Sequence, residues 1–180
     1  MAGYFVVVSG LPGSGKSTVG QQIASALALP FLDKDDILER LFESKGVGDV
    51  ERRRALSRES DCLFQMEASA LSAAVLVSHW HLPGMQSSSG TLTSWISQLS
   101  KQVVNIHCEC PVEVAAERFV ARKRHAGHLD RERSNAEVLS SLRNLAGFGR
   151  LDIGPRIDVD TSGPLDLDGV LSEIQRALTF

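Results

Sequence analysis

The chain has 180 residues, of which 43% are hydrophobic, and this is enough for one domain whose core covers both faces of a sheet. Its net charge of −3, from 19 Lys and Arg against 22 Asp and Glu, provides no overall positive field to attract nucleic acid or anionic lipid. No apolar run approaches the roughly 20 residues of a membrane helix, and the three cysteines form no zinc or disulfide pattern. We therefore expect one cytoplasmic domain, residues 1–180, that binds neither membrane nor nucleic acid.

Strands and helices are predicted in alternation along the first part of the chain. A near-continuous apolar run at 4–9 is typical of a strand buried on both faces, and a helix is expected at 16–27. A short strand at 30–33 leads to a helix at 36–42. Residues 49–72 contain neither Gly nor Pro, and they predict one long helix. The inward-facing residues of this helix are expected to be Val50, Leu56, Leu63, Met66 and Ala70.

The same alternation continues to the end of the chain. Further strands are predicted at 73–77, 103–108 and 157–159. Four further helices are predicted. The first covers 92–99, the second starts at Pro111 and runs into the basic residues 122–125, the third follows Arg133 and ends at about Ala146, and the fourth covers 167–178. The stretch 79–91 is rich in Gly, Pro and Ser, so we expect an exposed loop that contributes to a substrate pocket. Strands separated by helices, without hairpin signals, predict a parallel α/β sheet with helices on both faces.

A glycine-rich segment between the first strand and the first helix matches the P-loop pattern, whose context is a strand followed by a helix. Its glycines allow backbone N–H groups to turn inward around a polyphosphate, and the start of the helix adds its positive dipole end. Lys16 is expected to neutralise the β- and γ-phosphates, and Ser17 to supply a hydroxyl ligand to Mg²⁺. The predicted nucleotide-binding residues are Gly10, Leu11, Pro12, Gly13, Ser14, Gly15, Lys16, Ser17 and Thr18.

Two alternating carboxylates follow the second predicted strand, at the edge where open parallel sheets bind ligands. Asp33 and Asp35 are two residues apart, so both point the same way if the segment is extended. One carboxylate could accept a proton from an acceptor hydroxyl, and one could hold Mg²⁺ through water. The alternative is that Asp33 or Asp35 caps the following helix.

A basic cluster follows the fourth strand. It consists of Arg118, Arg122, Lys123, Arg124, His125 and His128, and Arg118 and Arg122 share a helix face at i, i+4. One interpretation is a mobile lid that brings arginines, Arg122 and Arg124 first, onto the transferring phosphoryl group. The alternative is a solvated basic helix end, which the helix dipole favours.

At these residues the sequence resembles the P-loop kinases of small molecules, the group of gluconate kinase, shikimate kinase and the chloramphenicol phosphotransferase-like and zeta-toxin-like ATPases. Residues 31–35 look like the gluconate and shikimate kinase segment whose two aspartates face Mg²⁺ and the substrate hydroxyl. Residues 32–36 are also similar to a polynucleotide 5′-hydroxyl kinase segment in which the position of Asp35 is the general base. The resemblance implies the P-loop NTPase fold, a five-stranded sheet in the order 2-3-1-4-5 with a lid after the fourth strand, at about 118–133.

The sequence departs from these relatives in three places. The third strand ends at Val77 without the acidic residue that related NTPases use for Mg²⁺. The His-Pro pair that follows the second aspartate of gluconate kinase is absent, and Leu38 replaces the arginine that follows the base in the polynucleotide kinase pattern. These departures concern the substrate more than the fold.

The sequence thus predicts an ATP-dependent kinase, with GTP as the alternative donor, that phosphorylates a hydroxyl of a small molecule. The predicted catalytic residues are Lys16, Asp35, Arg122 and Arg124, and the predicted Mg²⁺ site consists of Ser17 and Asp33. Trp80 and Met85 are expected as apolar contacts of the acceptor. The alternatives are a nucleotide or polynucleotide 5′-hydroxyl kinase and a switch that binds ATP without turnover. The sequence names neither the acceptor nor an oligomeric state.

Overall fold

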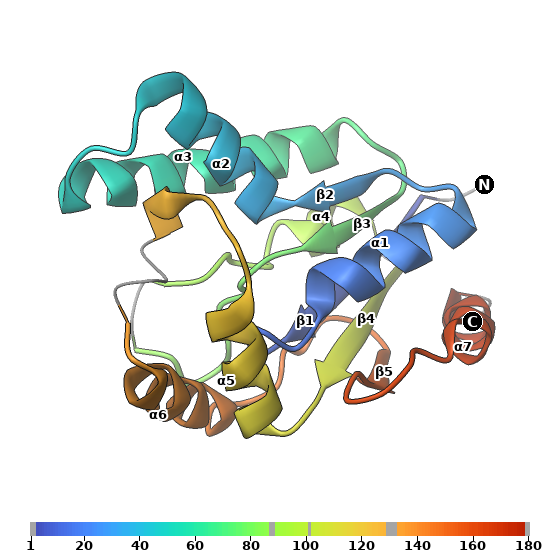
Figure 1. The fold of residues 1–180 in the computed structure, drawn as a ribbon. Helices are drawn as coiled ribbons and strands as arrows, with labels where there is room; N and C mark the ends of the chain where they lie inside the picture. Colours follow the sequence, from blue (N-terminus) through green and yellow to red (C-terminus); the bar gives the residue numbers. More distant parts are fainter. Residues whose placement is uncertain (1–2, 87–88, 101, 129–132, 179–180) are drawn as a thin grey trace.

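A five-stranded parallel sheet forms the centre of the computed structural model, which describes residues 3–86, 89–100, 102–128 and 133–178 (Figure 1). The strand order β2-β3-β1-β4-β5 confirms the predicted topology. The strands are β1 Tyr4–Gly10, β2 Phe31–Asp33, β3 Ala74–Val77, β4 Gln102–Glu109 and β5 Arg156–Asp160. Since all are parallel, their carboxyl ends meet at one edge, and this edge carries the polar residues discussed below.

Side chains of the strands alternate between two cores. On one face, Val6 and Val8 pack with Ile23 of helix α1 (Lys16–Leu27) and Ile174 of helix α7 (Leu167–Leu178). On the other face, Phe5 and Val7 pack against helix α3 (Val50–Ser69) and helix α4 (Ile96–Leu99). Residues 5–9 of the central strand are buried because both of its faces are covered, which explains its run of β-branched and aromatic residues.

Three further helices lie around the carboxyl edge of the sheet (Figure 1). They are α2 Lys34–Lys45, α5 Val112–Ala121 and α6 Asn135–Ala146, and a short 3₁₀ turn, η1, covers Ala126–His128. Helices α5 and α6 share a small apolar core around Phe119 and Leu142. None of the helices in the described ranges combines the length and the apolar composition of a bilayer span.

The predicted inner face of α3 is partly wrong. Val50, Met66 and Ala70 were expected to be buried, but Val50 and Met66 are 52% and 66% exposed and Ala70 is an exposed residue just after the helix. The buried residues are instead Leu56, Ser60, Phe64 and Ala68, which recur every four residues. This stripe packs against α2 at its beginning and against the sheet at its end, so a choice of apolar residues in the sequence alone misplaces the contact face.

The loop after β3 also differs from its prediction as an exposed segment. Trp80 is only 3% exposed, and its Nε1 donates a hydrogen bond of 2.8 Å to the carbonyl oxygen of Val8. Trp80 and the buried Thr91 form an isolated parallel bridge, so the loop returns to the sheet edge. The helix predicted at 92–99 is limited to α4, and residues 87–88 of the loop lie outside the described residues.

The two sides of α3 give a direct test of this packing. Phe64→Ala should lower the free energy of unfolding by about 3–5 kcal/mol, since it opens a cavity beside Trp80 and Trp95. The matched change Met66→Ala, on the exposed side, should stay within about 0.5 kcal/mol. Urea denaturation followed by circular dichroism measures both. Equal losses for the two variants would show that the contact face of α3 is wrongly assigned.

Candidate active site

The P-loop connects β1 to α1 and has the backbone that a phosphate cradle requires. Gly13 and Gly15 have φ angles of 83° and 88°, a region that favours glycine. A Cβ at Gly13 would lie 2.1 Å from the carbonyl oxygen of Ala115, so no other residue fits between the loop and α5. The loop leads directly into the amino end of α1, where free N–H groups and the helix dipole favour an anion.

Lys16 lies inside this loop. Its Nζ donates hydrogen bonds to the carbonyl oxygens of Gly10 at 3.1 Å and Leu11 at 2.9 Å. Burial lowers the pKa of Lys16, and the negative charges of Asp35 and Asp33 oppose this shift. The ammonium is therefore held close to the position where the loop would wrap a polyphosphate.

Ser17 and Asp33 form the candidate metal site. Ser17 Oγ donates a 2.6 Å hydrogen bond to Asp33 Oδ2, which joins the first turn of α1 to the end of β2. A hydroxyl and a carboxylate beside a phosphate cradle provide the hard oxygen donors that suit Mg²⁺. Within the described ranges, no three His, Cys, Asp or Glu side chains gather as a metal cluster, so the donor set would need phosphate oxygens and water besides these two residues. The residues present fit that role.

Of the two aspartates that could cap α2, Asp33 and Asp35, the structure shows that Asp33 is the cap. It is the N-cap residue, and its Oδ1 accepts a 3.0 Å hydrogen bond from the backbone N–H of Asp35. Burial, together with the charge of Asp35, raises the pKa of Asp33 from 3.8 to about 6, against the lowering effect of these hydrogen bonds. Asp35 lies in the first turn of the helix and leaves its own carboxylate for other contacts.

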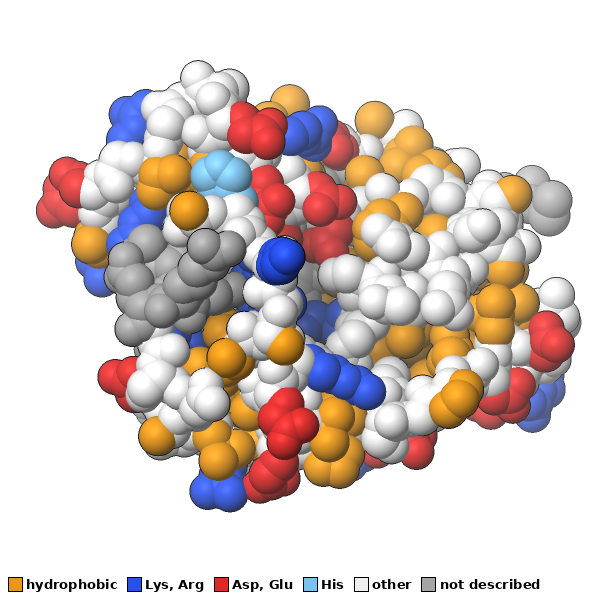
Figure 2. Space-filling view, viewed as in Figure 1, with side chains coloured by type: hydrophobic (Ala, Val, Ile, Leu, Met, Phe, Trp, Pro, Cys, Tyr) orange, Lys and Arg blue, Asp and Glu red, His pale blue; other side chains and the backbone are white. Residues whose placement is uncertain are grey.

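Asp35 faces the basic segment after α5. Its Oδ2 forms an ion pair with Arg124 Nη2, and the Asp35 side chain is 47% exposed. Asp35, Lys16 and Arg122 line the same cleft, which has a volume of about 920 Å³. Figure 2 shows acidic and basic side chains close together around this part of the surface. The structure thus brings the predicted catalytic side chains into one cleft.

The basic segment does not continue the helix as predicted. Helix α5 ends at Ala121, and the backbone becomes extended at Arg122. The segment then docks on α2, where Phe42 stacks on His125 at 5.4 Å between ring centroids and His128 Nε2 lies 2.9 Å from Glu39 Oε1. This segment is therefore packed against protein and is not a solvated helix end. Residues 129–132 of the predicted lid, 118–133, lie outside the described residues.

Sequence reasoning missed much of the cleft wall. Arg133 and Asn144 line it from beyond the basic segment and from α6, and no motif marks either residue. Met85 lines the cleft as expected, whereas Trp80 does not and belongs to the core. His79 was recognised only as part of a loop or substrate pocket.

His79 lies on the cleft wall, open to the cleft. Burial by the surrounding protein lowers its pKa to about 4, and the charges of Lys16 and Lys34 act in the same direction. The imidazole is therefore neutral at pH 7, so it can donate and accept hydrogen bonds without adding charge to the cleft.

A hydrogen-bonded chain of Ser78, Thr91 and Asp61 supports the cleft wall after β3, which ends at Val77. Thr91 Oγ1 donates a 2.7 Å hydrogen bond to Asp61 Oδ1, so the 2.6 Å contact between Ser78 Oγ and Thr91 Oγ1 is donated by Ser78. Lys34 Nζ lies 2.8 Å from the same Asp61 oxygen. The chain fixes the cleft wall at Ser78 without placing a carboxylate there.

Comparisons with known proteins agree with this geometry. A family model described as an AAA domain matches residues 5–146. A cytidylate kinase of Ignicoccus hospitalis is 30% identical over 153 residues, which cover 79% of this chain and 80% of that protein. A Chloroflexus aurantiacus structure with a provisional kinase description has a TM-score of 0.81 at 23% identity, covering 99% of this chain and all of the other. A gluconokinase structure from Sinorhizobium meliloti has a TM-score of 0.56 at 19% identity, covering 99% of this chain and 93% of that one.

The raised pKa of Asp33 predicts a specific pH dependence of stability without Mg²⁺ and nucleotide. The folded protein binds the carboxyl proton of Asp33 more tightly than the unfolded chain does. Protonation of Asp33 therefore contributes fully to the free energy of unfolding below about pH 4, and this contribution is lost as the pH rises through about 6. The loss has an upper limit of about 3 kcal/mol. Asp33→Asn removes the titration but keeps a capping side chain. Urea denaturation at pH 4 to 7 should show the parent losing stability relative to the variant, and a constant difference would contradict the shift.

Proposed function

Because this chain belongs to the AAA-domain family, in the P-loop small-molecule kinase group, we propose that it transfers the γ-phosphoryl group of ATP to a hydroxyl of a small molecule. One observation carries the proposal. The carboxylate of Asp35 lines the same cleft as the phosphate-binding Lys16 and the Ser17–Asp33 pair. A nucleotide-binding switch has no need of a proton acceptor beside its phosphate loop.

The proposed reaction needs little covalent chemistry from the protein. The acceptor oxygen forms a bond to the γ-phosphorus while the bond to the bridging β,γ-oxygen breaks, and ADP leaves. The acceptor proton passes to Asp35, and Lys16 neutralises charge that develops on the transferring group and on the leaving β-phosphate. Mg²⁺, held through Ser17 and the carboxylate of Asp33, would supply further charge neutralisation on the phosphates.

Arg124 and Arg122 provide the proposed lid function. In the structure Arg124 is paired with Asp35, which fixes the direction of the carboxylate. For Asp35 to reach an acceptor hydroxyl, the guanidinium of Arg124 has to give up part of this contact, and it could then contact the transferring phosphoryl group. The guanidinium of Arg122 packs on the ring of Phe119, 4.1 Å from the ring centroid. The segment 118–133 would act as a lid within a single kinase domain, residues 1–180.

A second candidate function is a nucleoside monophosphate kinase, which the cytidylate kinase relative favours. Arg118, Arg122 and Arg133 line the cleft and could bind an acceptor phosphate. Such an acceptor is already an anion, so it needs no general base. The two functions therefore differ in what they require of Asp35. A polynucleotide acceptor fits less well, since the net charge is −3.

The experiment that decides the class of acceptor is a screen for ADP release with Mg²⁺ and ATP. One panel contains hydroxylated metabolites and nucleosides, and the other contains nucleoside monophosphates. Turnover confined to the first panel supports the proposal. Turnover confined to the monophosphates would replace it with the second candidate, and binding of ATP without turnover on either panel would favour the switch.

Asp35→Asn should reduce phosphoryl transfer to an alcohol by roughly ten- to ten-thousand-fold, the range expected for loss of a general base. The affinity for Mg²⁺ and ATP should change little, because Asp35 makes no hydrogen bond to the P-loop in the structure. The neighbouring Asp36→Asn is the matched control, since Asp36 is an exposed residue of the same helical turn. Steady-state kinetics of both variants measure the effect. Near-normal turnover of Asp35→Asn with an alcohol would remove Asp35 from the mechanism.

Lys16→Ala should weaken ATP binding by about ten- to a hundredfold, because it removes a cation that makes charge-assisted hydrogen bonds to the phosphates. The fold should be retained, since among the described residues the Lys16 side chain makes hydrogen bonds only to its own loop. Lys45→Ala, a surface lysine paired with Glu59, is the control for lost charge. Titration calorimetry with ATP and Mg²⁺ measures both affinities. Unchanged affinity in Lys16→Ala would place the nucleotide elsewhere.

A further inference from the structure

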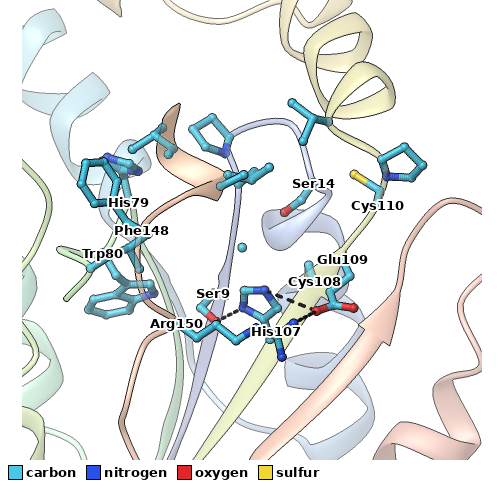
Figure 3. A pocket seen from close by; sticks show the side chains of 18 of the residues that line it. Ser9, Ser14, His79, Trp80, His107, Cys108, Glu109, Cys110, Phe148 and Arg150 are labelled. Carbon is cyan, nitrogen blue, oxygen red and sulfur yellow. Dashed lines mark hydrogen bonds and ion pairs between the residues drawn. The ribbon is translucent and has the colours of Figure 1, made fainter. Parts of the chain in front are cut away.

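A second cavity, of about 620 Å³, opens on the sheet face that lies opposite α1 and α7 (Figure 3). Its floor contains Ser9 of β1 with His107 and Glu109 of β4, and its walls include Trp80, Pro111 and Phe148. The strand residues face away from the core shared with α1, because Val8, Ile106 and Cys108 point to the other side. This volume is within the range of about 300–1,000 Å³ that is typical of small-molecule sites.

The cavity exists because apolar side chains cover only the beginning of this face of β4. Leu151 and Ile153, between α6 and β5, pack with Val103 at the beginning of the strand. Farther along, the same face of β4 carries Asn105, His107 and Glu109 in place of apolar residues. Polar side chains on a partly covered sheet face are costly unless hydrogen bonds satisfy them, so their arrangement indicates what they can still bind.

The hydrogen bonds of Ser9 determine the tautomer of His107. Asn105 Nδ2 donates to the carbonyl oxygen of Leu151 at 3.2 Å, so its Oδ1 is the atom that accepts from Ser9 Oγ at 2.8 Å. The one hydroxyl hydrogen of Ser9 is used in that bond. The 2.9 Å contact between Ser9 Oγ and His107 Nδ1 must then be donated by the ring.

His107 Nε2 is consequently an acceptor that faces the cavity floor. Burial, with the positive charge of Arg156, lowers the pKa of His107, so the ring is neutral at pH 7. Nε2 lies 3.9 Å from Glu109 Oε1, and neither atom can donate to the other in this state. Two acceptors that face each other at this distance leave room for a donor that bonds to both.

The charges around Glu109 are already balanced. Its Oε1 accepts from Arg156 at 3.0 Å and contacts Arg150 at 3.3 Å, and Asp158 pairs with the same arginines. All contacts of Glu109 side-chain oxygens that the described residues make use Oε1, which leaves Oε2 to accept from a ligand. A neutral donor therefore fits better than a further cation or anion.

The walls favour a flat apolar ring. Trp80 is fixed in direction by its Nε1 hydrogen bond to Val8, and Figure 3 shows Trp80, Phe148 and His79 together on one side of the cavity. Ser14 lines the cavity on the P-loop side, and its buried Oγ has no hydrogen-bond partner among the described residues. Buried hydroxyl groups without a partner are uncommon, so this atom is a second sign that the cavity is incomplete as it stands.

We propose that this cavity binds a neutral heteroaromatic ring with an exocyclic amino group, as in an aminopurine or aminopyrimidine. The amino group donates one hydrogen to His107 Nε2 and one to the carboxylate of Glu109, and the ring packs against Trp80 and Phe148. The site borders the P-loop, since Gly10, Leu11, Pro12 and Ser14 belong to its lining, but Lys16, Ser17 and Thr18 line the catalytic cleft and not this cavity.

The test uses adenine and purine, a pair of rings that differ by the amino group. Adenine is titrated into the full-length protein with the catalytic cleft saturated by ATP and Mg²⁺, and the indole N–H signal of Trp80 is followed by NMR. Adenine should bind and shift this signal, and purine should bind about tenfold or more weakly, as expected when a hydrogen bond to a charged acceptor is lost. Adenosine in a parallel titration distinguishes a free base from the base of a nucleoside.

Two variants and one control complete the experiment. Ala146→Phe fills the cavity from the exposed end of α6 and should abolish adenine binding without affecting the fold. Glu109→Gln should reduce the preference for adenine over purine. Asp158→Asn, on the same sheet face but outside the cavity lining, should bind adenine as the parent does. The proposal is overturned if adenine does not bind with ATP present, if purine binds equally well, or if Ala146→Phe binds as tightly as the parent.

Discussion

The position of the P-loop between α5 and the end of β5 is the constraint on which the rest of the site depends. Gly13 approaches the carbonyl oxygen of Ala115 so closely that a side chain is excluded, and this contact ties the loop to α5. On the other side, Thr161 Oγ1 lies 2.8 Å from the carbonyl oxygen of Ser14 and 2.9 Å from that of Glu109, so its single hydroxyl hydrogen is shared between them. The basic segment follows directly after the end of α5. The contact that shapes the phosphate cradle therefore also fixes the position from which the chain leads to Arg122 and Arg124.

Features that depend on short stretches of chain were predictable from the sequence. The P-loop requires a glycine pattern within nine residues, and β1 requires a local run of buried residues, so both were located correctly. The sheet order followed from the resemblance to P-loop kinases, since alternating strands and helices alone are compatible with several orders. Asp33 and Asp35 were found by spacing, yet only the structure shows that Asp33 both caps α2 and bonds Ser17.

Features that depend on contacts distant in sequence were not predictable. Trp80 was assigned to an exposed loop because residues 79–91 are rich in Gly, Pro and Ser, but the carbonyl oxygen of Val8, 72 residues away, accepts its indole hydrogen. Met66 and Phe64 are both apolar residues of one helix, and only the position of the sheet decides which is buried. The polar floor at Ser9 and His107 is invisible in the sequence, since these residues belong to different strands and each strand reads as an ordinary buried run.

The two cavities meet at a shared wall, and this arrangement has a consequence for the kinase reaction. His79, Leu145 and Phe148 line both the catalytic cleft and the second cavity. Gly149, beside Phe148, donates a backbone hydrogen bond to the carbonyl oxygen of Pro83, so the same segment supports the loop from which Met85 lines the catalytic cleft. Close-packed interiors transmit displacements, and any coupling between two sites is reciprocal. If an occupant of the second cavity shifts Phe148 and thereby changes the affinity for the acceptor, the acceptor changes the affinity for that occupant by the same factor.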